Sequence, residues 1–216
     1  MKRIALCIVF LCFFRVLCAQ EIELSGGYGY GSWKQFSHNF GGTLGYDLFL
    51  KPRHRIGVSF SFGVSTVPYN DTYISLATGR AVNRAKVTPY NSHAALRVSY
   101  TWSMVNKPRF KLNFGPEIGL NSFWIRETAD GAANGNTPGG KVTFEGSKMN
   151  RWGSGLLIEA ELKQVIQKNT ALFFSILPEI TGYEISGQKG SNSPATIGWL
   201  NLNVGIRYSL SHPKKR

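Results

Sequence analysis

The sequence predicts an all-β protein, an eight-stranded antiparallel up-and-down transmembrane β-barrel. Eight segments alternate apolar residues with small, polar or charged ones, which is the periodicity of strands that have two different faces. Connections after odd-numbered segments are longer, especially 67–90 and 126–150, whereas those after even-numbered segments are mostly four to seven residues. The apolar faces carry no Asp, Glu, Lys or Arg. In an up-and-down barrel this pattern places long loops at one rim, tight turns at the other and lipid around the outside.

The predicted strands are 22–30, 40–50, 55–66, 91–102, 109–125, 151–162, 170–183 and 199–210. The third alternates most clearly, with Ile56, Val58 and Phe60 on one face and Gly57 and Ser59 on the other. No helical period fits this order. The last strand alternates in the same way and is expected to close the barrel.

A soluble lipid-binding barrel, with the apolar faces turned inward, is the structural alternative. Eight strands enclose a lumen just wide enough for side chains to fill. The apolar faces are too bulky for that lumen, whereas the opposite faces of Gly, Ser, Asn and Thr with a few charges fit inside it. We therefore expect the apolar faces to meet lipid. Interfacial aromatic residues are then expected at the long-loop rim (Trp124, Trp152 and Trp199) and at the short-turn rim (Trp102 and Tyr208).

The first 19 residues have the features of a secretory signal peptide. Lys2 and Arg3 precede an apolar run over 4–14 that is too short to span a bilayer, and Ala19 precedes the expected cleavage point. The predicted division is a signal peptide over 1–19, an outer-membrane barrel over 20–210 and a basic tail over 211–216.

Removal of this leader changes both the cysteine content and the charge of the chain. The three cysteines, Cys7, Cys12 and Cys18, all precede the cut, so disulfides and Cys-based chemistry are not expected in the mature protein. Loss of Lys2, Arg3 and Arg15 takes the formal net charge from +13 to +10. Export argues against nucleic acid as a partner of this basic chain. We expect the charge to favour anionic lipid or glycolipid head groups, or to lie on solvated loops and turns.

Two strands share a local Pro-Glu motif, Gly115-Pro116-Glu117 and Leu177-Pro178-Glu179. Proline cannot donate to a ladder and a closed barrel has no edge strand, so we expect a bulge or a local break at each motif. Both glutamates are expected in the lumen, where Arg97 and Arg207 could neutralise them. The predicted lumen ion-pair set is Arg97, Glu117, Glu159, Glu161, Glu179 and Arg207, and we expect a structural network rather than a conducting or proton-relay role.

The histidines give little support for catalysis. Ser37-His38 lies in the first loop and Ser92-His93 at the start of the fourth strand, both near the long-loop rim. Adjacent residues on a strand point to opposite faces, so Ser92 and His93 are not placed to hydrogen-bond to each other. No metal-ligand spacing, phosphate loop or dinucleotide fingerprint appears. We expect no catalytic, metal or cofactor site. A lipid-modifying enzyme that uses a rim histidine and a narrow pore are the alternatives.

The final strand carries a sequence pattern known from other proteins. Asn203, Gly205, Tyr208 and Leu210 match the polar-x-Gly-x-x-aromatic-x-hydrophobic order of the C-terminal β-signal of outer-membrane proteins, although here the chain continues to Arg216. This resemblance implies recognition by the barrel-assembly machinery. The whole mature chain resembles small eight-stranded barrels of the OmpA/OmpX type. Its Ala19-Gln20 junction, Pro-Glu motifs and basic character resemble outer-membrane barrels of Bacteroidota, including the PorT-like group linked to secretion.

These observations together predict an integral protein of the bacterial outer membrane with a packed polar lumen. Its long loops, 67–90 and 126–150, are expected to lie outside the cell, where they bind an extracellular ligand or serve a structural or secretion-accessory role. The expected partners are outer-membrane lipid, the barrel-assembly machinery, and an extracellular ligand or secretion components.

Overall fold

The computed structural model describes residues 20–74, 81–134, 137–144, 148–184 and 196–210. The predicted leader, 1–19, and the predicted basic tail, 211–216, lie outside the described residues. Within the described part of the chain, no helix has the length and apolar character needed to cross a membrane.

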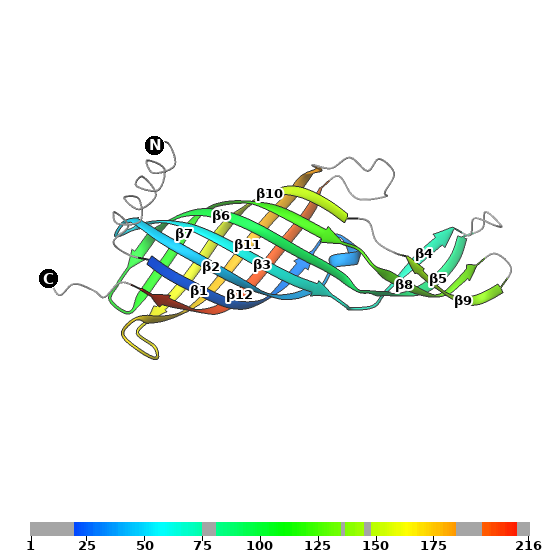
Figure 1. Cartoon of the computed structure of the whole chain (residues 1–216), viewed down its shortest axis with the longest axis horizontal. Helices are drawn as coiled ribbons and strands as arrows, with labels where there is room; N and C mark the ends of the chain where they lie inside the picture. The colour runs from blue at the N-terminus through cyan, green and yellow to red at the C-terminus, as the bar shows by residue number, and fades with distance from the viewer. Residues whose placement is uncertain (1–19, 75–80, 135–136, 145–147, 185–195, 211–216) are drawn as a thin grey trace, which may run out of the picture.

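Eight long strands close into a barrel in the order β1-β12-β11-β10-β7-β6-β3-β2 (Figure 1). Their bounds are β1 Gln20–Gly31, β2 Asn39–Lys51, β3 His54–Ser65, β6 Asn91–Asn106, β7 Phe110–Trp124, β10 Lys148–Lys163, β11 Thr170–Glu184 and β12 Ile197–Ser209. Every neighbouring pair is antiparallel, and β1 pairs with β12 to close the barrel. The predicted fold class is confirmed.

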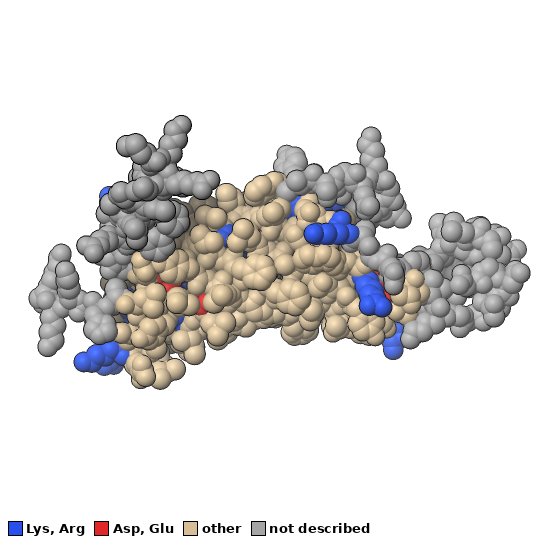
Figure 2. All heavy atoms as spheres, in the orientation of Figure 1, with Lys and Arg blue, Asp and Glu red and all other residues tan. Residues whose placement is uncertain are grey.

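Exposed apolar side chains continue from strand to strand around the outside. Leu24 pairs with Leu44, Leu44 with Phe60, and Phe60 with Leu96, and each of these side chains is more than half exposed. Figure 2 shows few charged atoms over the middle of one face, with most of the visible Lys and Arg toward its two ends. An exposed apolar belt of this extent is the outer surface expected of a barrel that lies in lipid.

Each Pro-Glu motif interrupts one ladder. Between β6 and β7 the pairing passes from Ser99–Glu117 to Trp102–Phe114 and omits the positions beside Pro116. Between β10 and β11 the pairs 155–179 and 158–176 flank a similar gap beside Pro178. The register is the same on both sides of each gap. Of the two expected outcomes, the structure therefore shows local breaks and not bulges at the prolines.

The two long loops form strands of their own. β4 Tyr69–Ile74 pairs with β5 Ala81–Pro89, and β8 Glu127–Asn134 pairs with β9 Thr137–Phe144. β5 and β8 also pair, which joins the two hairpins into one four-stranded sheet beyond the barrel rim (Figure 1). The expectation of connections without strands is wrong here. These sequences lack the apolar alternation of a half-buried strand, and it is their pairing with one another that defines the sheet.

Candidate functional site

The barrel lumen holds three layers of side chains between the short-turn rim and the long-loop rim. The turn-side charge cluster consists of Glu21, Glu23, Asp47, Arg55, Lys111, Glu159, Glu161 and Arg207. The central charge cluster consists of Arg97, Glu117 and Glu179. The apolar plug consists of Phe36, Phe123, Met149, Ile197 and Trp199. Strand alternation turns these side chains inward, except for Phe36, which enters the lumen from the 3-10 turn Lys34–Phe36.

Arg207 lies at the centre of the turn-side charge cluster. Its two terminal nitrogens donate to both carboxylate oxygens of Glu159, at 2.9 and 2.7 Å. The same nitrogens donate to Glu161 at 2.7 Å and to Glu23 at 2.6 Å. Nε lies 3.1 Å from Asp47 and 3.6 Å from Glu21. One planar guanidinium therefore neutralises carboxylates from several strands at once, which is the geometry that arginine provides and lysine does not.

Arg55 joins the same cluster from the start of β3. Its terminal nitrogens lie 3.2 Å from Asp47 and 3.1 Å from Glu159. The Lys111 ammonium lies 4.4 Å from the centre of the Phe49 ring, within the range of a cation–π interaction. The side chains of Arg55, Lys111 and Arg207 are all nearly fully buried. Buried charges of this kind are retained only where opposite charges and hydrogen bonds compensate them.

Arg97 organises the central charge cluster. Its Nε lies 3.2 Å from Glu117 and its Nη2 lies 3.0 Å from Glu179. Asn121 Nδ2 donates to the other Glu179 oxygen at 2.6 Å, and the Asn121 side-chain oxygen lies 2.9 Å from His93 Nε2. The two Pro-Glu motifs thus bring their glutamates to one arginine.

The six residues of the predicted ion-pair set occur in two groups. Arg97, Glu117 and Glu179 lie together, and Arg207, Glu159 and Glu161 lie together. The prediction that Arg207 helps to neutralise the motif glutamates is not met, since its ion pairs are with the carboxylates near the short turns. Sequence reasoning left five cluster members out of the set, namely Glu21, Glu23, Asp47, Arg55 and Lys111. They share the inward parity of the predicted residues, so strand register is the signal that could have found them.

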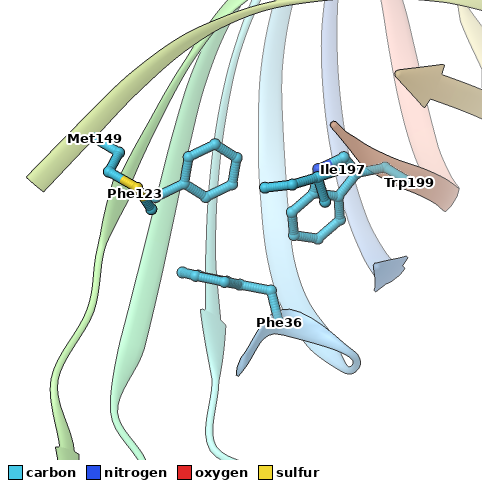
Figure 3. Close-up of a cluster of buried hydrophobic side chains, with 5 residues drawn as sticks. All are labelled: Phe36, Phe123, Met149, Ile197 and Trp199. Carbon is cyan, nitrogen blue, oxygen red and sulfur yellow. The ribbon is translucent and has the colours of Figure 1, made fainter. Parts of the chain in front are cut away.

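The apolar plug closes the lumen below the long loops (Figure 3). A single 3-10 turn, η1 Lys34–Phe36, follows β1 and buries Phe36 completely. The Phe36 ring lies edge-on to Phe123 and to Trp199, with centroids 5.2 and 5.9 Å apart. The side chains of the plug point toward one another from η1, β7, β10 and β12. The contacts among these apolar side chains close the lumen at the long-loop rim.

The position of Trp199 corrects the expected aromatic girdle. The sequence predicts Trp199 at the lipid–water interface, but it is 5% exposed and stacks on Phe123 inside the barrel. Its chain neighbour Leu200 faces outward, so alternation directs Trp199 inward. Trp124 and Trp152 do lie on the outer surface at this rim, at 37% and 51% exposure.

The described histidines have neutral polar partners. The His93 ring lies against both Phe123 and Trp199, with centroids 4.9 and 5.4 Å away, and its Nε2 contacts Asn121, so His93 belongs to the lining of the plug. His38 contacts the Tyr28 hydroxyl, and His54 Nδ1 lies 2.7 Å from the Tyr100 hydroxyl. Among the described residues, no group of three or more His, Cys, Asp or Glu is arranged to hold a metal ion.

A small polar cavity remains within the barrel. Its volume is about 70 Å³, and its lining includes Glu23, Asp47, Arg55, Arg97 and Glu117. This space suits a few water molecules, which would bond to the charged groups around them. A drug-sized ligand needs a pocket of about 300–1,000 Å³. This cavity is therefore too small for a drug-sized ligand.

A polar junction connects the barrel to the loop sheet. Glu127, at the start of β8, accepts hydrogen bonds from Gln35 at 3.1 Å, Tyr69 at 2.8 Å and Asn91 at 3.2 Å. Asn91 also donates to the Gln35 carbonyl at 2.9 Å and accepts from the Arg126 amide at 2.8 Å. Asn91 and Glu127 are buried. The junction therefore holds η1 and both loop hairpins against the start of β6.

The predicted assembly-signal residues lie along the last strand. Asn203 faces inward and donates to the Ser175 hydroxyl at 3.3 Å, whereas Tyr208 and Leu210 are exposed on the outside. A Cβ added at Gly205 would lie 2.4 Å from the Leu24 carbonyl oxygen. Gly205 is thus required for the close approach of β1 and β12, a structural role that is separate from any signal.

Solved structures of outer-membrane proteins share this fold. Neisserial surface protein A is 12% identical, with a TM-score of 0.53 and coverage of 88% of this chain and 97% of its own. A major outer membrane protein from Thermus thermophilus is 14% identical, with a TM-score of 0.52 and coverage of 89% and 98%. At these identities the similarity establishes the fold alone. No family model matches the chain, and no curated protein matches it.

Proposed function

We propose that this chain is a non-enzymatic integral barrel of the bacterial outer membrane that presents its loop sheet to an extracellular partner. The observation that carries the proposal is the pairing of β5 with β8, which makes one surface from two loops that are far apart in sequence. Surface segments held by a rigid scaffold are where binding sites commonly lie.

The membrane location is supported by the exposed apolar belt and by the placement of the charged side chains at inward-facing strand positions. The outward row through Leu24, Leu44 and Phe60 is uncharged, while the acidic side chains of the same barrel lie in the lumen. An Arg or Lys on the lipid side would cost about 2–4 kcal/mol at the membrane midplane. The expected signal peptide supports export.

A closed lumen supports a binding role over a pore. The apolar plug fills one end, the turn-side charge cluster fills the other, and about 70 Å³ remains between the charged groups. We expect no single-channel steps above background in planar bilayers. Well-defined conductance steps would favour the narrow-pore alternative.

The topology can be tested with protease sites inserted in living cells. A site inserted within 75–80, between β4 and β5, should be cut in intact cells. The same site inserted at Pro52, in a short turn, should be cut only after the outer membrane is opened. The reverse pattern would invert the proposed topology, and cleavage of both sites in intact cells would argue against membrane insertion.

The finer assignments belong to the same proposal. We propose that β12 is recognised by the barrel-assembly machinery and that the chain is akin to the PorT-like barrels of Bacteroidota, with a structural or secretion-accessory role as the second candidate. Tyr208→Ala is the clean test of recognition, because Tyr208 is exposed whereas Gly205 is needed for strand packing. Tyr208→Ala should lower the membrane level of the barrel without changing its refolding in detergent. Normal membrane levels would exclude this signal.

A further inference from the structure

The turns at the short-turn rim carry only positive charges. Its turns, 51–53, 107–109 and 163–169, contain six Lys or Arg and no Asp or Glu, and two of them are the same Lys-Pro-Arg tripeptide. The strands they join follow one another around the barrel, so the three turns are neighbours. The Arg109 carbonyl accepts from the Lys163 amide at 3.0 Å, and the Arg53 carbonyl accepts from the Ser103 amide at 2.8 Å. The turns therefore form one continuous basic surface.

The turn 163–169 adds an apolar tip to this surface. Val165 and Ile166 are 53% and 69% exposed. Thr170 closes the turn, since its carbonyl accepts from the Gln164 amide at 2.7 Å and its hydroxyl accepts from the Gln167 amide at 2.8 Å. In Figure 1 this yellow segment extends to the side of the barrel. Exposed apolar side chains on a hydrogen-bonded turn are thus held beyond the barrel wall.

The tip also continues the apolar belt. Leu162 and Leu172 pair across β10 and β11 directly before the turn, and both are exposed. Lys163 and Lys168 flank the tip, and Lys163 Nζ donates to Asn106 at 3.0 Å, which ties it to the neighbouring turn. Apolar residues that enter a leaflet between lysines whose charges remain at the head groups form an interfacial anchor.

We propose that Val165 and Ile166 insert into the leaflet at the short-turn rim, and that the basic turns bind the phosphate groups of its anionic lipids. The proposal rests on the membrane location proposed above. The three turns carry cations and no carboxylate, which favours an anionic surface, and the continuity with Leu162 and Leu172 favours lipid over a protein partner. Each basic residue near an anionic surface should contribute about a fivefold preference.

A fluorophore on a single cysteine tests the anchor. Because the three native cysteines all precede residue 20, Ile166→Cys can carry an environment-sensitive label in the mature barrel, with Lys107→Cys in the neighbouring turn as the control. The labelled barrels are reconstituted in phosphatidylcholine vesicles with or without phosphatidylglycerol, and insertion is checked by heat-dependent gel mobility. Brominated acyl chains should quench the label at 166 and not the label at 107. Phosphatidylglycerol should strengthen the quenching at 166, and Lys163→Gln or Lys168→Gln should lower the ratio of inserted to exposed label about fivefold each.

Three outcomes would overturn the inference. In an inserted barrel, equal access of aqueous iodide to the labels at 166 and 107 would exclude the anchor, leave the membrane location intact and favour a protein partner for the tip. If quenching of the label at 166 changed neither with phosphatidylglycerol nor with the two lysine substitutions, the anionic-lipid assignment would be excluded. A barrel that fails to insert would overturn this inference and the proposed function together.

Discussion

Arg207→Met is the sharpest perturbation of the lumen. The Arg207 guanidinium lies within 3.6 Å of five carboxylates and is 1% exposed. Methionine has a similar shape but no charge and no donors. The substitution therefore leaves those carboxylates facing one another, with Arg55 and Lys111 as the remaining cations of the cluster.

The size of the effect follows from the contacts. Removal of one partner from a buried ion pair costs about 3–5 kcal/mol. The two hydrogen bonds to Glu159, each worth about 1.5–3 kcal/mol for a charged group, sum to about 3–6 kcal/mol, which overlaps this range. We expect the free energy of unfolding to fall by about 3–5 kcal/mol. Adding Glu161→Gln to Arg207→Met should recover part of the loss, because it removes one carboxylate whose arginine partner is gone.

Urea unfolding of the barrel in lipid vesicles, followed by tryptophan fluorescence, measures this change. The control is Arg126→Met, whose side chain is exposed and whose effect should stay within about 0.5 kcal/mol. If Arg207→Met lowered the free energy of unfolding by less than about 1 kcal/mol, the cluster would contribute no more than an exposed surface ion pair. That result would refute its stabilising role. Further destabilisation by Glu161→Gln in the same background would refute the proposed charge imbalance.

Three other substitutions test the packing of β1 against β12, the apolar plug and the polar junction. Gly205→Ala should cost about 1–3 kcal/mol in the same urea titration because its Cβ would overlap the Leu24 carbonyl; Gly26→Ala, with its nearest atom at 3.9 Å, should be near neutral, and equal effects would contradict the packing argument. Phe36→Ala should lower the free energy of unfolding by about 3–5 kcal/mol because it opens a cavity in the plug. The variant should still show no conductance in planar bilayers, because the charge clusters fill the rest of the lumen. New conductance steps would show that the plug alone seals the barrel. Asn91→Ala should speed proteolysis of the loop hairpins in the detergent-folded barrel, because it removes bonds to Glu127 and Gln35; digestion no faster than in Ser92→Ala would contradict the junction.

The inner and outer faces of each strand could be predicted from the sequence because alternation depends only on neighbouring residues. Ile56, Val58 and Phe60 alternate with small residues, and that order predicts a strand between lipid and a narrow lumen without knowledge of its neighbours. The same parity placed Glu159 and Arg207 inside. It also implies that Trp199 points inward beside the outward Leu200, whereas the general preference of tryptophan for the interface predicts the opposite and is wrong at this position.

The partners of those inward residues depend on strand register, which alternation does not determine. Register and barrel closure bring Glu21 from the first strand and Glu159 from β10 to Arg207 on the last strand, and they give both motif glutamates to Arg97. Phe36 follows no strand period, and its role as part of the plug emerges only when η1 folds over the rim.

The sequence by itself determined the eight barrel strands, their inner and outer faces and the sorting of long and short connections, because each is a local pattern along the chain. Tertiary structure alone decided which charges pair, how the lumen closes and that two distant loops share one sheet. These features depend on contacts between segments many residues apart, and such contacts leave no period in the sequence to read.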